Sequence, residues 1–266
     1  MHPLLEDLED ALERSKMGQV TSGLGLPFRA ARFLTKNTKL VPFVIIPAVI
    51  NALLFGLSAF FLVSHAGDLV EWLWQKPGAD AFLEYLLVAL WYVFYALSII
   101  LALVVSYFVV LLAGGIVASP FHDLLSEHTE RILRGTDELP ESDASFVADT
   151  LRSLGSSAGI ALLYLVIIAP VMLLNLIPGA GNMAATIIGT GVSAFFVSLE
   201  YTDPTLERHQ VPLKKKLRLI REHLPLTGGF GLGASLLLWV PLLNFLCMPI
   251  AVIGGTALAM VLAPDE

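Results

Sequence analysis

The chain has 266 residues, of which 56% are hydrophobic and 15% are charged, and its formal net charge is −7. A soluble domain of this size would leave large apolar surfaces in water, so the composition excludes an ordinary soluble protein and indicates an integral membrane protein. The single cysteine, Cys247, excludes an intrachain disulfide and has no second thiol for a metal site.

The first 21 residues form an acidic segment that is expected to be a short cytoplasmic helix. It lacks the basic and apolar regions of a cleaved signal peptide. Its leucines could pack within the chain or contact a partner, and the sequence does not decide between the two. Residues 26–39 then predict a helix at the membrane surface, with apolar residues facing inward and Arg29, Arg32 and Lys36 at the lipid headgroups.

Two apolar stretches, 40–64 and 85–119, exceed the roughly 20 residues that a membrane-spanning helix needs. Residues 65–84 between them predict an outer loop. After the second span, residues 119–135 predict a separate amphipathic helix on the membrane surface, with Ser119 as N-cap and Pro120 as its first residue.

This surface helix contains four side chains that could bind a metal, His122, Asp123, Glu127 and His128. At 100° per residue the two histidines point to different sides of a helix. An ordinary amphipathic helix is therefore favoured over a metal site, and no cofactor is expected.

Two further apolar stretches are interrupted near their middles. Residues 153–199 contain no Lys, Arg, Asp, Glu or His and are broken by NLIPGAGN at 175–182, while 224–264 are broken by VPLLNFLCMP. The legs 160–177 and 183–199 are just long enough to span, but 226–240 is only about 22 Å long as a helix. We therefore predict two helical hairpins, the second of which penetrates the bilayer partway.

The breaks have two interpretations. Each could be a tight turn, or the two could meet around a polar cavity, since broken backbone at membrane depth has to be buried in protein or line water. In the second case Gly179 and Gly181 would let backbone N–H groups converge on an anion, and Asn182 would cap the next helix. Asn244 would then hydrogen-bond across to the first tip, whereas under the first interpretation it caps or bonds its own hairpin.

The distribution of basic residues predicts the topology. Every Lys and Arg except Lys76 flanks the apolar stretches on one side, which the positive-inside rule assigns to the cytoplasm together with both termini. Residues 119–152 and 200–223 are then cytoplasmic or interfacial. Within them, 213–224 predict a helix that contacts anionic lipids, with Leu213, Leu217, Ile220 and Leu224 on its inner face. Glu200 lies at the end of an apolar run, where hydration is favoured over a proton relay.

Five segments resemble, in order, the CysZ family of bacterial inner-membrane sulfate permeases and their relatives. They are FVIIPAVIN, VASPFHDLLSE, LIPGAGN, EYTDPTLERHQVP and PLLNFLCMPIAVIGGTAL, and the resemblance covers roughly residues 22–260. It implies two long spanning helices, two partly penetrating hairpins, interfacial helices, assembly into a homo-oligomer and passage of sulfate.

One departure concerns the substrate. Family members tied to sulfate carry a Gly-Leu-Arg element just before the first span, where this chain reads TKLVPF. Lys39 presents a compact ammonium charge to an anion, whereas an arginine would present a planar guanidinium group with several N–H donors. We expect Lys39, with Arg29 or Arg32, to recruit the anion on the cytoplasmic side.

Together these features predict a single all-α, polytopic membrane domain, residues 1–266, that passes a small oxyanion, above all sulfate, across the bacterial inner membrane. No catalytic constellation occurs, so an enzyme is not expected, and neither is a nucleic-acid partner. The alternative is a non-transporting membrane protein that acts in assembly or membrane shaping.

Overall fold

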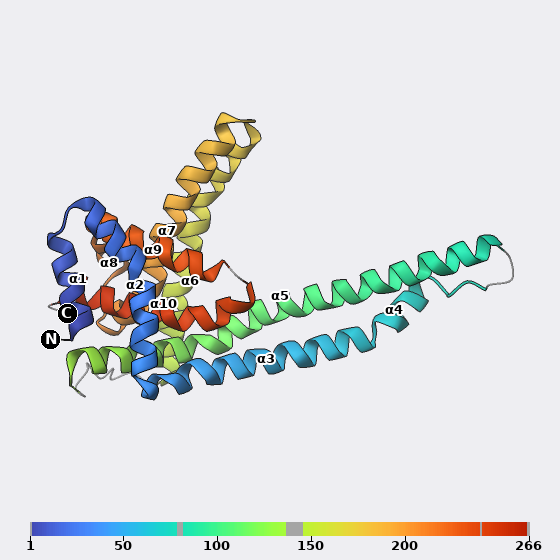
Figure 1. Cartoon of the computed structure of the whole chain (residues 1–266), viewed down its shortest axis with the longest axis horizontal. Helices are drawn as coiled ribbons and strands as arrows, with labels where there is room; N and C mark the ends of the chain where they lie inside the picture. The colour runs from blue at the N-terminus through green and yellow to red at the C-terminus, as the bar shows by residue number, and fades with distance from the viewer. Residues whose placement is uncertain (1, 79–81, 137–145, 240, 265–266) are drawn as a thin grey trace. The chain divides into compact units, whose positions relative to one another are not determined.

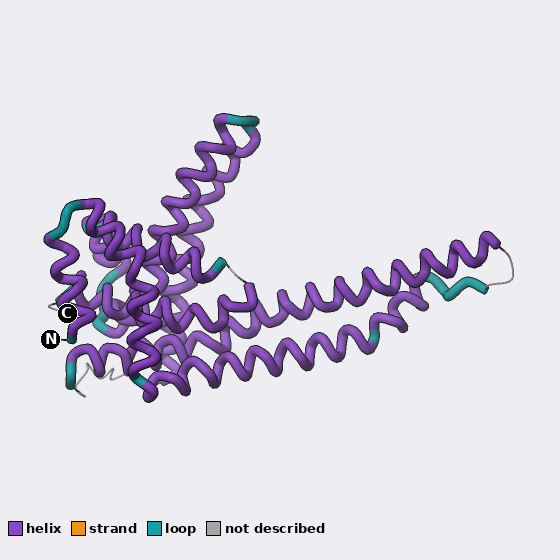
Figure 2. The backbone as a smooth tube through the Cα atoms, in the orientation of Figure 1, coloured by secondary structure: helices purple, strands orange, loops and turns teal. Residues whose placement is uncertain are grey.

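The computed structural model describes residues 2–78, 82–136, 146–239 and 241–264, and for some helical residues in these ranges, including 241–246, the backbone alone. Within this part of the chain, helices joined by short turns account for the secondary structure (Figure 2). The predicted all-α class is confirmed. The chain divides into two compact units, one made of Met1–Val44 and Pro120–Glu266 (unit 1) and the other of Ile45–Ser119 (unit 2).

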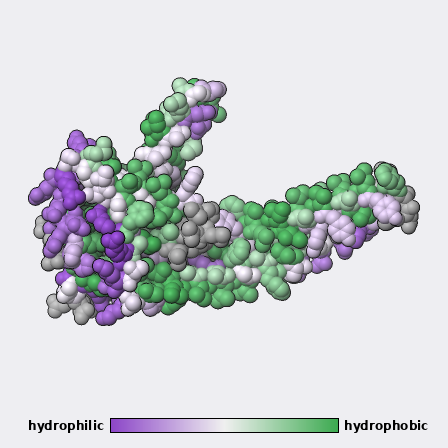
Figure 3. All heavy atoms as spheres, in the orientation of Figure 1, coloured by the Kyte–Doolittle hydropathy of each residue, from purple (hydrophilic) through white to green (hydrophobic). Residues whose placement is uncertain are grey.

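Unit 2 contains most of α3 (Val41–Ser64), all of α4 (Ala66–Leu73) and the first part of α5 (Phe82–Arg134). Its surface is strongly hydrophobic along both long helices (Figure 3). The segments Thr38–Leu73 and Glu84–Gly115 are long and apolar enough to cross a membrane, which agrees with the two predicted spans. Helix α4 lies in the predicted outer loop and was not foreseen.

Aromatic side chains join α4 and the loop after it to α5. Trp91 donates a hydrogen bond from Nε1 to the Trp74 carbonyl oxygen at 3.0 Å and stacks on Tyr95. Lys76 donates to the Tyr92 hydroxyl at 2.8 Å and lies over the Tyr92 ring. Such Trp and Tyr side chains are typical of the boundary between lipid and water, where one end of each ring system needs a polar partner.

The second predicted span and the surface helix after it are one continuous helix. Helix α5 runs from Phe82 to Arg134 with Pro120 inside it, so the prediction that Ser119 caps a new helix was wrong. Gly114, Gly115 and Pro120 are residues that commonly end a helix, but the preceding helix continues through all three. A proline with helical φ removes one backbone hydrogen bond and leaves the rest of the ladder in place.

Helix α5 is also longer than a bilayer is thick. Its apolar segment of 32 residues, Glu84–Gly115, extends about 48 Å at 1.5 Å per residue, against about 30 Å of hydrocarbon. This segment therefore spans a membrane only if it tilts strongly or if part of its apolar surface is covered.

Unit 1 contains the remaining helices, which are α1 (Pro3–Glu13), α2 (Lys16–Lys36), η1 (Thr38–Leu40), α6 (Phe146–Leu173), η2 (Leu174–Leu176), α7 (Ala180–Arg208), α8 (Leu213–Glu222), α9 (Leu224–Leu238) and α10 (Pro241–Leu262). Helices α6 and α7 form a hairpin that projects from the other helices of this unit (Figure 1). Hydrophilic residues gather over the end that carries α1, α2 and α8 (Figure 3).

The predicted first hairpin is confirmed, and both of its legs are of spanning length, Ala158–Leu176 and Ala180–Arg208. In the second hairpin, α9 has the predicted 15 residues. The break is shorter than expected, however, because α10 already begins at Pro241 and continues through Asn244 and Pro249.

Glycines allow the helices of unit 1 to pack so closely that the backbone of one helix contacts the backbone of the next. A Cβ added at Gly229 would lie 2.3 Å from the Val20 carbonyl oxygen of α2, and one at Gly231 would lie 1.8 Å from the Ala194 carbonyl oxygen of α7. Helix α9 is thus held between α2 and α7, with the Phe230 side chain fully buried. Small residues at helix contacts are the usual basis of close packing in membrane proteins.

The structure decides between two alternatives for one surface helix and differs from the prediction for another. The acidic helix α1 buries Leu4, Leu5, Leu8 and Ala11 and packs on α2 and α10, so its leucines serve the chain itself. In α8, Ile220 faces inward as expected, but Leu213 is exposed and Lys216 is buried; Leu224, the first residue of α9, is exposed as well. A charge that was assigned to the lipid surface therefore lies in the interior.

Candidate functional site

The basic residues that were expected to recruit an anion lie on one stretch of unit 1. Lys39, in η1, and Arg32, on α2, are exposed. Arg29 is half-buried, with Nη2 donating to the Ser22 carbonyl oxygen and Nη1 3.9 Å from Asp7 Oδ2 of α1. Its Nε is buried and has no hydrogen-bond partner among the described residues. One donor of the Arg29 guanidinium is thus left unused.

Both glycines at the tip of the α6–α7 hairpin are needed for the backbone conformation of the turn. Gly179 is the N-cap of α7 with φ of 78°, in the left-handed region that favours glycine. A Cβ added at Gly181 would lie 2.2 Å from the Leu174 carbonyl oxygen. Asn182 lies within the first turn of α7, so the prediction that it caps this helix was wrong.

The surface of this tip is apolar. Leu176, Ile177 and Met183 are 78%, 57% and 68% exposed. In Figure 1 the tip lies away from both α9 and α10, so a single chain does not bring the two hairpin tips together. The side chain of Asn244 falls outside the described residues.

A buried ionic cluster, not foreseen from the sequence, connects the end of α5 to the end of α7. The carboxylate of Glu130, with no exposed surface, accepts hydrogen bonds from Arg134 Nε at 2.9 Å, Arg208 Nη1 at 2.6 Å and His209 Nε2 at 2.6 Å. Burial by itself raises the pKa of Glu130, but the His209 hydrogen bond and the arginine charges outweigh it and hold this pKa below its ordinary value. Glu130 is therefore ionised at neutral pH, and two guanidinium groups share it.

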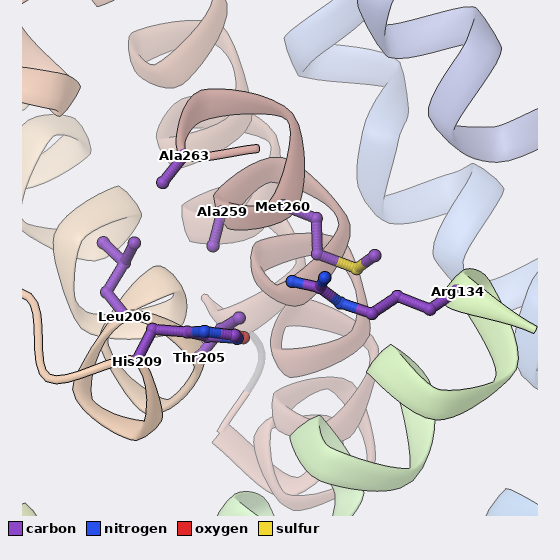
Figure 4. A pocket seen from close by; sticks show the side chains of 7 residues that line it. All are labelled: Arg134, Thr205, Leu206, His209, Ala259, Met260 and Ala263. Carbon is purple, nitrogen blue, oxygen red and sulfur yellow. The ribbon is translucent and has the colours of Figure 1, made fainter. Parts of the chain in front are cut away.

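A small pocket lies beside this cluster (Figure 4). The side chains of Arg134 and His209 point toward each other across it, and its lining is completed by Thr205, Leu206, Ala259, Met260 and Ala263. Arg134 and His209 of the cluster thus face a space that is lined by residues of three helices, α5, α7 and α10.

Hydroxyl groups join the same three helices close by. Thr256 donates to Ser126 Oγ at 3.0 Å, and the Ser126 and Thr205 hydroxyls are 2.9 Å apart. All three residues are buried. The Thr129 hydroxyl is buried as well and finds no hydrogen-bond partner in the described part of the chain. This region is therefore a polar interior within an otherwise apolar fold.

A second buried ionic cluster fixes α8 to the hairpin. Lys216 Nζ lies 2.6 Å from Asp203 Oδ1 and also donates to Glu207, while Ser156 of α6 donates to Asp203. The Lys216 side chain is 1% exposed. A buried charge of this kind is tolerated because it is paired and hydrogen-bonded.

The candidate metal ligands do not assemble into a site. His128 Nδ1 bonds the Leu124 carbonyl oxygen of its own helix, and its ring packs against Phe43. Among the described residues there is no group of three or more His, Cys, Asp or Glu side chains that could hold a metal ion.

Comparison with known proteins adds to this geometry. Residues 26–249 match the model of a family described as sulfate transporter CysZ/etoposide-induced protein 2.4. The chain belongs to this family.

Individual members of the CysZ family are similar over most of their length. A protein named sulfate transporter CysZ from Vibrio parahaemolyticus is 29% identical, over 81% of this chain and 85% of its own. Proteins of the same name from Pseudomonas aeruginosa and Vibrio cholerae are also 29% identical, over 80% and 81% of this chain and 85% and 84% of their own. The resemblance stated from sequence segments is thereby confirmed. Helix α1 lies before the matched region.

Proposed function

We propose that this protein passes sulfate across the bacterial inner membrane. The observation that carries the proposal is the family match over residues 26–249, together with relatives named sulfate transporter CysZ that align over most of both chains. Four helical segments of spanning length in the described residues are consistent with it.

The proposal includes a site of first contact with the anion. Lys39 and Arg32 are exposed cations and Arg29 is a half-buried one, so these residues can attract a divalent anion and replace part of its hydration shell. We place them on the cytoplasmic side with both termini, in a homo-oligomer whose surface helices contact anionic lipids. The two hairpin tips, if they meet, do so between subunits.

Uptake of radiolabelled sulfate into proteoliposomes tests the function. Proteoliposomes with the wild-type protein should take up sulfate, and empty vesicles should not.

Sulfate binding by variants, measured by calorimetry, tests the site of first contact. Lys39→Ala should bind sulfate more weakly than the wild-type protein. Lys39→Arg should bind it more strongly, because an arginine presents a planar fork of donors to an oxyanion. Lys214→Ala, which removes an exposed charge on α8, is the matched control. Absence of uptake by the wild-type protein would reject the function, and unchanged binding by Lys39→Ala would remove Lys39 from the site.

A further inference from the structure

The acidic helix α1 lies against one of the cations that the proposed function assigns to the anion. Its residues 6–13 include five carboxylates, Glu6, Asp7, Glu9, Asp10 and Glu13, and no basic side chain. The helix is held by its apolar face, on which Leu8 and Ala11 are fully buried. Because this face is anchored on α2 and α10, the position of Asp7 next to Arg29 follows from packing.

The ion pair between Asp7 and Arg29 is loose. The shortest distance is 3.9 Å, and the Asp7 side chain is 58% exposed while that of Arg29 is 28% exposed. An exposed pair of this length contributes little to the stability of the fold. The Asp7 carboxylate can therefore be displaced by a stronger ligand without loss of the fold.

Arg29 itself retains capacity for another ligand. Its Nη2 is committed to the Ser22 carbonyl oxygen, but its buried Nε has no partner among the described residues. Burial lowers the pKa of this guanidinium and Asp7 opposes the effect. A partly desolvated arginine with an unused donor binds an oxyanion better than a fully hydrated one.

We infer that α1 is an acidic cover that competes with the transported anion for Arg29, with Asp7 as the competing carboxylate. This inference rests on the proposed function, because it regulates the same site. The anion has to displace Asp7 before it occupies Arg29, so the negative charge of Asp7 sets the affinity for sulfate. Helix α1 precedes residues 26–249, the region that matches the family, so the family match does not include this contact.

The test is sulfate binding by purified full-length variants, measured by calorimetry at low ionic strength. Asp7→Asn should bind sulfate about two- to fivefold more tightly than wild type, which is the fold-change corresponding to loss of an exposed ion pair. Asp10→Asn removes the same charge from an exposed position of the same helix and is the control. In an Arg29→Gln background, Asp7→Asn should have no effect, because the group for which Asp7 competes is gone.

The outcomes separate this inference from the proposed function. If wild-type protein transports sulfate but Asp7→Asn and Asp10→Asn bind it equally, the cover is rejected and the function stands. If there is no transport but Asp7→Asn binds sulfate more tightly through Arg29, the function is rejected and the cover stands. If the wild-type protein and Asp7→Asn both fail to bind sulfate, both are rejected.

Discussion

Glu130 is a carboxylate with no exposed side-chain surface, surrounded by Arg134, Arg208 and His209. Its burial would favour the neutral acid, yet its partners favour the charged form more strongly and lower its pKa. Removing one member of a buried ionic group commonly costs about 3–5 kcal/mol, because the remaining charge is left without compensation. Glu130 should therefore contribute to the free energy of unfolding in a pH-dependent way.

The sign of this dependence follows from the lowered pKa. A carboxyl group with a folded-state pKa below its unfolded value of 4.5 contributes stability that is complete above that value. The contribution is lost as the pH falls below 4.5 through the folded-state pKa. Thermal unfolding in detergent should show that wild-type protein loses stability over this range. Glu130→Gln should be less stable at pH 7 and lose less on acidification.

Glu222→Gln removes an exposed carboxylate from the end of α8 and is the control for this experiment. It should follow the wild-type curve at every pH. Equal acid sensitivity of Glu130→Gln and wild-type protein would show that Glu130 does not stabilise the fold through its charge.

The sequence predicted the buried and exposed residues of α2 correctly, but it did not predict the burial of Lys216 on α8. In α2 the helical spacing correctly placed Leu26 and Phe33 inside and Arg32 outside. Lys216, by contrast, lies on α8 beside the inner residue Ile220, and its burial depends on Asp203, which comes from a different helix. Periodicity within one helix cannot reveal a partner on another, and the cluster around Glu130 was missed for the same reason.

At the scale of elements, the contacts of α9 make a specific prediction about its glycines. Gly231→Ala places a methyl group 1.8 Å from the Ala194 carbonyl oxygen, so α9 and α7 have to move apart. Overpacking of this kind costs about 1–3 kcal/mol. Gly228→Ala meets nothing within 4 Å and should stabilise the helix by up to about 1 kcal/mol, since alanine favours helix over glycine. Thermal unfolding of the two variants should therefore shift in opposite directions.

Gly228 and Gly231 lie three positions apart on the same helix, α9. An effect that alanine has on this helix in general would therefore change the stability of both variants in the same way. Equal shifts in the same direction would contradict the close contact between α9 and α7.

Element boundaries were predicted where the chain has strong local signals. The break at 175–182 contains Pro178 and two glycines, and the structure turns there, with Gly179 at positive φ. Ser119 and Pro120 were taken to begin a new helix, and Pro249 was taken as part of a break with a second proline and an asparagine; in both cases the helix continues through the proline. Helix α4 was missed because eight residues are too few for a clear periodic pattern.

At the scale of the whole molecule, the number and length of apolar segments fixed the membrane class, but sidedness remains a prediction. Gly78 follows α4 in the predicted outer loop, and Gln210 lies between α7 and α8 among basic residues; both are exposed. In a Cys247→Ala background, Gly78→Cys should react with an impermeant thiol reagent added to intact cells, and Gln210→Cys should not. Both should react after the membrane is permeabilised.

Labelling of Gln210→Cys from outside would overturn the assignment of both termini to the cytoplasm. The positive-inside rule supports that assignment because only Lys76 lies between the first two spans.

The backbone contacts of unit 1 have a consequence for the timescale of permeation. Gly229 and Gly231 bring α9 against α2 and α7, and Gly255 brings α10 against the Tyr201 carbonyl oxygen of α7. None of these helices can slide past its neighbour without first separating from it, so the four helices move as one body. Helix displacements take roughly microseconds to milliseconds, whereas rotation of a side chain takes roughly picoseconds to nanoseconds. Any step of permeation that requires these helices to slide is therefore expected on the slower timescale, and any step that requires only a side chain to rotate is expected on the faster one.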